Sequence, residues 1–129
     1  MRSKKASRPD NKLPEKESDI VRAILDFLHY HHIVSFRSNT GAMSGEHTNK
    51  LGKTNRWFVR FNEPGYPDIT GCLKDGKYLA IEVKRRDGKA TPDQLRFLQI
   101  IIDNHGVAFV ARSVDQVNDI LKSLGYLKK

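Results

Sequence analysis

The segment between Ile69 and Lys84 constrains the fold of this chain most strongly, because it predicts two antiparallel strands joined by a short turn. In the second strand, alternate residues are apolar and point to one face, as strand geometry requires: Leu79, Ile81 and Val83. Glu82 and Lys84 therefore lie side by side on the opposite face. The tripeptide Lys74-Asp75-Gly76 turns the chain before this strand.

The length of that turn decides which residue faces Glu82 across the strand pair. A two-residue Asp75-Gly76 turn would place Asp68 opposite Val83 and send its side chain to the wrong face. A three-residue turn, with Gly76 in the left-handed conformation of a bulged hairpin, would place Asp68 opposite Glu82. We expect the second register, because Gly76 permits it and because metal binding by the two carboxylates requires it.

In this register, Asp68, Glu82 and Lys84 form the set of groups that a hydrolytic metal site for phosphodiesters needs. Carboxylate oxygens hold a hard divalent ion, the ion lowers the pKa of a bound water, and a nearby cation orients that water or offsets charge in the transition state. An all-oxygen site favours Mg²⁺ or Mn²⁺. The alternative is a structural ion-pair cluster, which is unfavourable because inward charges are costly to bury.

The size and charge of the chain narrow the class of partner. Its 129 residues are enough for one domain with a real core, and its net charge of +8 favours a polyanionic partner. Nucleic acid is a better candidate than a membrane, because no apolar run approaches the length of a bilayer span and the N-terminus is polar throughout. The single cysteine, Cys72, excludes an intrachain disulfide framework and predicts a cytoplasmic location.

The N-terminal residues 1–14 are rich in Lys, Arg, Ser, Asn and Pro and nearly free of apolar residues, which predicts a disordered basic arm. About half of the net charge lies in this arm. The arm either contacts phosphate or only keeps the protein soluble. Residues 15–129 are predicted to form a single domain.

A helix is predicted after Pro14, because apolar residues recur at helical spacing: Ile20, Val21, Ile24, Phe27 and Leu28. Glu17 falls on the core-facing edge of this helix, in the first turn, where the helix dipole tolerates an anion. Glu17 is either a residue of the capping region or a residue of the site.

Further strands are predicted at Ile33–Arg37, Arg56–Phe61 and Val107–Ala111, and a long polar loop is predicted at residues 39–55. Apolar spacing after Val114 predicts the last helix. The predicted fold class is α/β, with a mixed sheet flanked by helices in the order α-β-β-β-α-β-α.

A second helix is predicted between the strands, with Thr91 as its N-cap and Pro92 in its first turn. Gln94 precedes Leu98 by one turn, so its side chain is expected on the buried side of this helix.

The ordered set of motifs resembles the PD-(D/E)XK nuclease superfamily: a Glu on the first helix, Gly-x-Pro-Asp, Glu-x-Lys, and a Gln early in the next helix. More narrowly, three segments resemble the VRR-NUC (virus-type replication-repair nuclease) family: Arg37-Ser38-Asn39-Thr40-Gly41-Ala42, Gly65-Tyr66-Pro67-Asp68 and Thr91-Pro92-Asp93-Gln94. Each motif alone is weak, whereas the ordered set in its helix and strand context is specific. The resemblance spans about Glu17 to Leu121 and implies a restriction-endonuclease-like core.

The resemblance also implies a role for each matching residue. The implied metal ligands are Asp68, Glu82, the backbone carbonyl of Val83 and, directly or through water, Glu17. Lys84 would position the attacking water, and Gln94 would fix Lys84 or that water. Free-standing members of the family are similar in organisation to Holliday-junction resolvases, which implies a homodimer with two sites.

The residues and the resemblance together predict a divalent-metal-dependent deoxyribonuclease, an endonuclease that hydrolyses phosphodiester bonds in branched or structured DNA. The residues expected to contact DNA are Arg37, Asn39, Thr40, Lys50, Lys53, Arg85, Arg86 and Lys89. Three alternatives stay open: a non-catalytic module that binds structured DNA, a monomeric flap or single-strand nuclease, and an enzyme that cleaves RNA.

Overall fold

The computed structural model describes residues 15–38, 42–60 and 65–128. The elements follow in the order α1 (Glu17–Tyr30), β1 (Val34–Arg37), β2 (Ala42–Thr48), β3 (Thr54–Arg60), β4 (Ile69–Cys72), β5 (Tyr78–Val83), α2 (Pro92–Asp103), β6 (Val107–Ala111) and α3 (Val114–Ser123). The basic arm predicted at residues 1–14 lies outside the described residues, as do Asn39 and Thr40. No helix in the described ranges is long and apolar enough to cross a membrane.

The main sheet has four strands in the order β1-β4-β5-β6. The pairs β1–β4 and β4–β5 are antiparallel and β5–β6 is parallel, so the sheet is mixed. The helices and the strands of this sheet follow the order α-β-β-β-α-β-α along the chain, and the strand predicted at Arg56–Phe61 corresponds to β3, which lies outside this sheet. The predicted fold class is therefore confirmed for the body of the protein.

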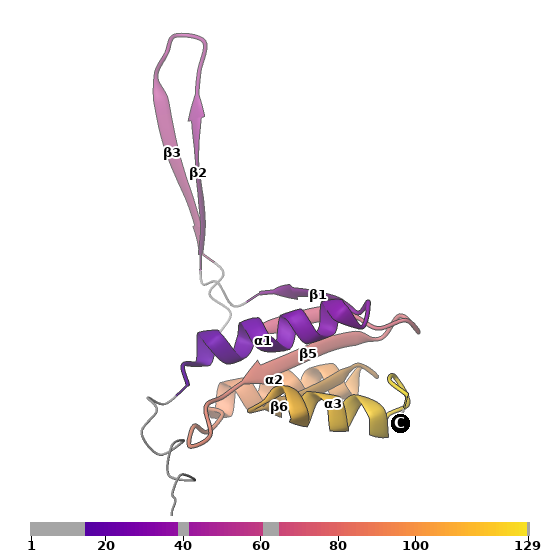
Figure 1. Ribbon diagram of the computed structural model, residues 1–129. Coiled ribbons are helices and arrows are strands. Elements are labelled where there is room, and N and C mark those ends of the chain that lie inside the picture. The colour runs from indigo at the N-terminus through magenta and orange to yellow at the C-terminus, as the bar shows by residue number, and fades with distance from the viewer. Residues whose placement is uncertain (1–14, 39–41, 61–64, 129) are drawn as a thin grey trace, which may run out of the picture.

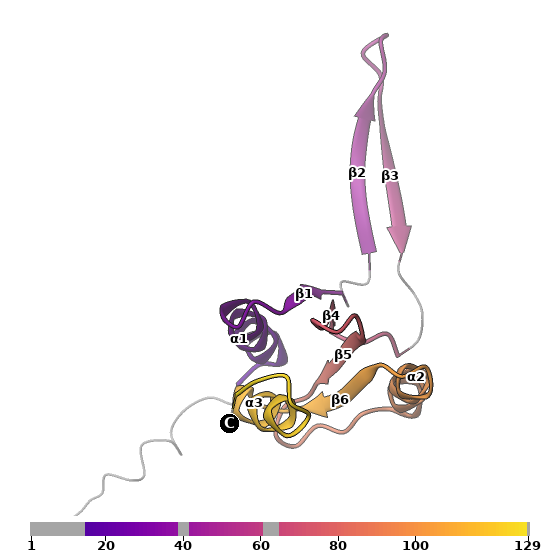
Figure 2. The ribbon, with the colours of Figure 1, turned by 90° about the vertical axis from the view of Figure 1, so that its right-hand side faces the viewer.

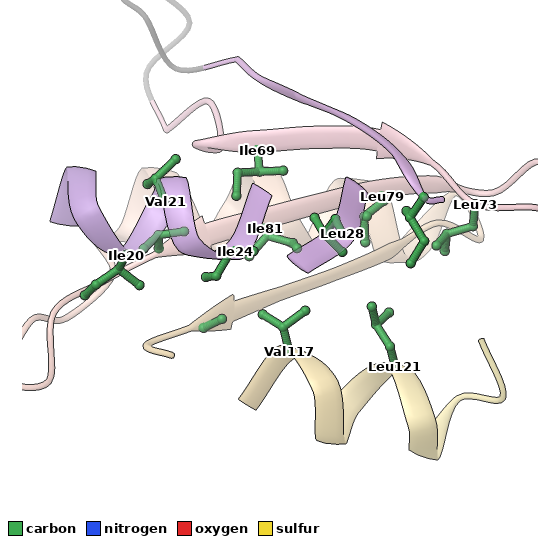
Figure 3. Close-up of a cluster of buried hydrophobic side chains, with 13 residues drawn as sticks. Ile20, Val21, Ile24, Leu28, Ile69, Leu73, Leu79, Ile81, Val117 and Leu121 are labelled. Carbon is green, nitrogen blue, oxygen red and sulfur yellow. The ribbon is translucent and has the colours of Figure 1, made fainter. Parts of the chain in front are cut away.

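The sheet is covered on both faces. Helices α1 and α3 lie on one face and α2 lies on the other (Figure 2). The core lies between the sheet and the α1–α3 layer (Figure 3), and it contains apolar side chains from α1, β4, β5 and α3: Ile20, Val21, Ile24, Leu28, Ile69, Leu79, Ile81, Val83, Val117 and Leu121. The helical and alternating spacings predicted from the sequence are those that place these residues inward.

The β4–β5 register is the predicted one. Ile69 pairs with Ile81 and Cys72 with Tyr78, and Leu73 N–H donates to the carbonyl oxygen of Lys77 across a three-residue turn. Gly76 has φ +89°, the left-handed conformation that the bulged turn requires. This register places Asp68 opposite Glu82.

The prediction of a loop at residues 39–55 was wrong, because Ala42–Thr48 is a strand. This strand, β2, pairs along its whole length with β3 and forms a separate two-stranded sheet. The β2–β3 hairpin stands away from the four-stranded sheet in both views (Figures 1 and 2). Its described side chains, residues 46–56, are exposed apart from the half-buried Asn49, so the sequence has no inward and outward alternation that would reveal a strand.

Candidate functional site

Asp68 is fixed to the backbone of the strand that carries Glu82. It lies directly before β4, opposite Glu82 near the end of β5, and its Oδ2 accepts a hydrogen bond from the backbone N–H of Val83 at 2.8 Å. The carboxylate of Asp68 is therefore tied to the residue that follows Glu82. This hydrogen bond holds the carboxyl group of Asp68 close to that of Glu82 across the strand pair.

The segment before Asp68 is held between the end of β1 and the start of α2. Ser38 donates twice, from its N–H to the carbonyl oxygen of Asp68 at 2.8 Å and from its hydroxyl to the carbonyl oxygen of Pro67 at 3.0 Å. The ring of Tyr66 packs edge-on against Phe97 of α2, with centroids 5.1 Å apart. The Gly-Tyr-Pro-Asp motif, residues 65–68, is thus a structural clamp: its contacts with β1 and α2 fix the position of the Asp68 carboxylate.

Gly65 makes the clamp possible. It has φ +84°, and a Cβ built at this position would overlap the backbone carbonyl of Asp93 at the start of α2. Only glycine combines this conformation with so close an approach.

Glu82 is a buried carboxyl group that lacks full pairing. The residue is 1% exposed, and among the described residues its Oε1 has no hydrogen-bond partner. Its Oε2 lies 3.4 Å from Nζ of Lys84, whose side chain is also largely buried. Burial, and then the charge of Asp68 and a hydrogen bond with it, raise the pKa of Glu82 to about 8, while the ammonium of Lys84 opposes this rise.

The buried pair has the chemistry of a cation site. The negative charge of Asp68 raises the pKa of Glu82, and a bound cation would relieve this repulsion and give the unpaired oxygen of Glu82 a partner. In the described part of the chain, no group of three or more His, Cys, Asp or Glu side chains could hold a metal ion. The donors that fit an ion here are therefore the two carboxylates and main-chain oxygen.

Replacing Glu82 with Gln is expected to stabilise the metal-free protein. The substitution replaces a carboxyl group, whose charged form is disfavoured by burial and by the charge of Asp68, with a neutral amide of the same size. Thermal unfolding in a chelating buffer should show a higher Tm for Glu82→Gln. The matched control is Glu46→Gln, because Glu46 is an exposed carboxylate paired with Arg56, and its loss should leave Tm nearly unchanged. A lower Tm for Glu82→Gln would instead identify the carboxylates as a structural ion-pair cluster.

Glu17 is the first residue of α1 and is partly exposed. The first turn of α1 lies toward the same end of the sheet as the carboxyl end of β5 (Figure 1). The side chain of Glu17 makes no hydrogen bond or ion pair with another residue in the described ranges. The fold brings Glu17 to the end of the sheet where the carboxylates lie, but not into direct contact with them.

Gln94 is engaged at the start of α2. Its Oε1 accepts from the N–H of Thr91 at 2.8 Å, and its own N–H donates to Oγ1 of Thr91 at 3.2 Å. This is a capping box, and it confirms Thr91 as the N-cap. The backbone of Gln94 lies beside Gly65, so the helix start contacts the clamp, while the amide oxygen of Gln94 pairs with Thr91 rather than with Lys84.

The basic residues predicted to contact DNA separate into two groups. Arg85, Arg86 and Lys89 are exposed and lie in the segment that follows Lys84. Lys50 and Lys53 are exposed at the tip of the β2–β3 hairpin, away from that end of the sheet (Figure 1). Arg37 is exposed at the end of β1.

Arg112 is a residue that the sequence interpretation missed. It follows β6, and its guanidinium donates to the carbonyl oxygen of Gly88 at 2.7 Å. The turn that it holds is closed by a hydrogen bond from Gly88 N–H to the carbonyl oxygen of Arg85. Arg112 therefore fixes the basic turn after Lys84. The only signal in the sequence was its position directly after a strand parallel to β5.

A mixed four-stranded sheet flanked by helices, with two opposed carboxylates and a lysine at the end of one strand pair, defines a protein of the restriction-endonuclease-like fold. The family model described as the VRR-NUC domain matches residues 14–115. The chain belongs to the VRR-NUC family. Membership indicates a nuclease that acts on DNA, in a family that generally uses divalent metals. No curated protein matches the sequence.

Proposed function

We propose that this protein is a divalent-metal-dependent endonuclease that hydrolyses phosphodiester bonds in branched or structured DNA. The observation that carries the proposal is the pairing of the part-buried Asp68 with the buried Glu82, whose Oε2 lies beside Lys84 while its Oε1 has no hydrogen-bond partner among the described residues. A cluster built for stability alone would not leave a buried carboxyl oxygen without a partner.

The residues that would hold the metal are those of the buried pair and its neighbours: Asp68, Glu82, the backbone carbonyl of Val83 and, directly or through water, Glu17. A bound Mg²⁺ or Mn²⁺ would supply Lewis-acid activation of water and neutralisation of charge on the phosphate. The ammonium of Lys84, held at 3.4 Å from Glu82, would orient the attacking water in line with the scissile bond. Gln94 supports the site indirectly, by fixing the start of α2 against Gly65.

Phosphate binding is assigned to the basic turn after Lys84. Arg85, Arg86 and Lys89 are exposed in the segment that follows Lys84, and Arg112 holds the turn in place. Cations at this position would contact the phosphates on either side of the scissile one. The net charge of +8 favours association with DNA as a whole.

The proposed assembly is a homodimer, because symmetric cutting of a junction requires two sites at a fixed spacing. The apolar residues Val117 and Leu121 of α3 are in the core, so the last helix is not free to supply the interface. Exposed apolar side chains lie on α2 instead: Leu95, Ile100 and Ile102. We propose that α2 faces the second copy and that the protein works in the cytoplasm, where Cys72 would stay reduced.

Cleavage assays with labelled four-way junction, flap, duplex and single-stranded DNA test the proposal. We expect no cleavage with a chelator, recovery with Mg²⁺ or Mn²⁺, and paired nicks on opposing arms of the junction. Light scattering should report a dimer at micromolar protein. Metal-independent cleavage would contradict the metal site, and binding without cleavage in any metal would favour the non-catalytic module. A monomer that prefers flaps or single strands would contradict only the junction and dimer assignments.

A further inference from the structure

The two points at which the main body connects to the β2–β3 hairpin (Ala42–Arg60) lie beside the candidate site. The chain leaves the main sheet after Ser38, which donates hydrogen bonds to the carbonyl oxygens of Pro67 and Asp68, and it returns at Gly65, against the start of α2. The hairpin is therefore an insertion between two neighbouring strands of the sheet, β1 and β4, at the point where Asp68 is delivered.

The hairpin pairs only with itself in the described sheet topology, and it projects away from the body (Figures 1 and 2). Its cross-strand contacts include an ion pair between Arg56 and Glu46 at 3.2 Å and a hydroxyl pair between Thr48 and Thr54 at 2.8 Å. An isolated two-stranded hairpin is at best marginally stable in water. A hairpin of this kind gains stability when another molecule covers it.

The tip of the hairpin is an ordered basic turn. The side-chain oxygen of Asn49 accepts from the N–H groups of Leu51 and Lys53, and Gly52 takes the left-handed conformation with φ +82°. This turn displays Lys50 and Lys53, and neither lysine forms an ion pair with another described residue. Leu51 lies between them and is 92% exposed. Two lysines on either side of an exposed leucine suit a ligand such as duplex DNA, in which charged phosphates flank apolar base surfaces.

The length of the hairpin matches a short run of double helix. Each strand has seven residues, so the arm extends roughly 20 Å at about 3.3 Å per residue. Duplex DNA rises about 3.4 Å per base pair, so the strands of the arm alone span roughly six base pairs, and the tip would reach phosphates at least that far from a scissile phosphate held at the carboxylates. A two-stranded ribbon also has the width to enter the major groove.

We infer that the β2–β3 hairpin is a DNA-gripping arm that lies along the double-helical part of the substrate. Lys50 and Lys53 contact its phosphates, and Leu51 enters the groove between them. This inference rests on the proposed nuclease function for its substrate, and it identifies that substrate as DNA with at least one duplex segment of roughly six base pairs beside the cleaved bond.

Tethered cleavage from the tip tests the inference without using the nuclease activity. In a Cys72→Ser background, which removes the one exposed cysteine, Leu51→Cys carries an iron–EDTA reagent that cuts nearby DNA with ascorbate and peroxide. We expect a cluster of cuts at least about six base pairs from the bond that the unmodified protein cleaves in Mg²⁺. The matched control is Lys74→Cys, in the β4–β5 turn at the other end of the sheet, which should give no cuts in that cluster.

Binding measurements give the second test. The double variant Lys50→Ala/Lys53→Ala should bind a duplex-containing junction about tenfold more weakly at moderate salt, and the slope of log affinity against log salt should fall by about 1 to 2. Lys74→Ala/Lys77→Ala removes the same charge from the β4–β5 turn and should change both quantities much less. The rate of single-turnover cleavage by bound Lys50→Ala/Lys53→Ala protein should stay near wild type.

Three results would overturn the inference. These are position 51 giving no DNA cuts while binding persists, the tip variant keeping wild-type affinity and salt slope, or the tip variant changing the oligomeric state alone. The last result would assign the arm to a second copy of the chain. Tip-directed cuts from a protein that cleaves nothing in Mg²⁺ or Mn²⁺ would leave the arm intact and refute only the proposed function.

Discussion

The substitutions Asp68→Asn and Glu82→Gln should each lower the single-turnover cleavage rate by about a thousandfold or more, with little change in DNA affinity. Each replaces a carboxylate oxygen in the Asp68–Glu82 pair, in which Asp68 accepts from the Val83 N–H and Glu82 lies against the ammonium of Lys84. Because the two carboxylates would act on one ion, the double variant should lose little more than either single variant. Rapid-quench kinetics and fluorescence anisotropy measure the two quantities separately.

Variants of three other residues test the supporting roles at the site and provide a control. Lys84→Ala should lose cleavage comparably, because its ammonium lies against Glu82. Glu17→Ala should lose about tenfold, as expected for a supporting contact through water. Glu15→Ala removes an exposed carboxylate two residues earlier and should leave the rate unchanged. A Glu82→Gln protein with near wild-type cleavage would contradict the site, and a larger loss for Glu15→Ala than for Glu17→Ala would contradict the assigned phase of α1.

Gly65→Ala should also lower the cleavage rate strongly, although it removes no catalytic group. A methyl group at this position meets the carbonyl oxygen of Asp93, so the segment 65–68 must move away from α2. A displacement of about 1 Å at a catalytic carboxylate can cost about a hundredfold in rate. We expect a loss of that size in cleavage together with a lower Tm.

The control for Gly65→Ala separates the strain of the backbone from the steric overlap. Gly76 also has a left-handed conformation, with φ +89°, but a Cβ there meets no atom within 4 Å. Gly76→Ala should therefore lose about 1 to 2 kcal/mol of stability and keep its cleavage rate. Equal losses of cleavage in the two variants would show that the contact between the clamp and α2 does not position Asp68.

The site could be predicted from the sequence where short-range rules determine the geometry. The alternation in Tyr78–Val83 fixed the face of Glu82, and Gly76 allowed the turn that places Asp68 opposite it. Neither rule reports burial, so the unpaired oxygen of Glu82 and its raised pKa could not be foreseen. They depend on how the sheet packs against its helices.

The side chain of Gln94 follows a local rule of helix capping. Thr91-Pro92-Asp93-Gln94 has the spacing of a capping box, in which the Gln side chain returns to the N-cap. Helical phase placed Gln94 on the buried side, but the cap determines where its amide oxygen goes. Its predicted role toward Lys84 stays a prediction.

Only one strand of the hairpin was predicted: the strand expected at Arg56–Phe61 corresponds to β3. Hydrophobic periodicity did not reveal β2, whose described side chains are exposed. The signal that did exist was the turn, Asn49-Lys50-Leu51-Gly52-Lys53, flanked by the threonines that pair across it. A turn between two polar segments does not by itself predict a hairpin, because such a hairpin becomes stable only when another molecule covers it.

The insertion of the hairpin also affects how the chain folds. Strands β1 and β4 are neighbours in the sheet, yet roughly 30 residues separate them along the chain, and closing a loop of that length carries an entropic cost. If the hairpin forms first, on the microsecond timescale of such elements, the loop that remains to be closed is roughly a dozen residues. By the logarithmic dependence of closure entropy on length, this saves roughly 0.8 kcal/mol in bringing β1 to β4. The arm assigned to DNA would then also act early in folding, as the element that brings together the two strands from which it extends.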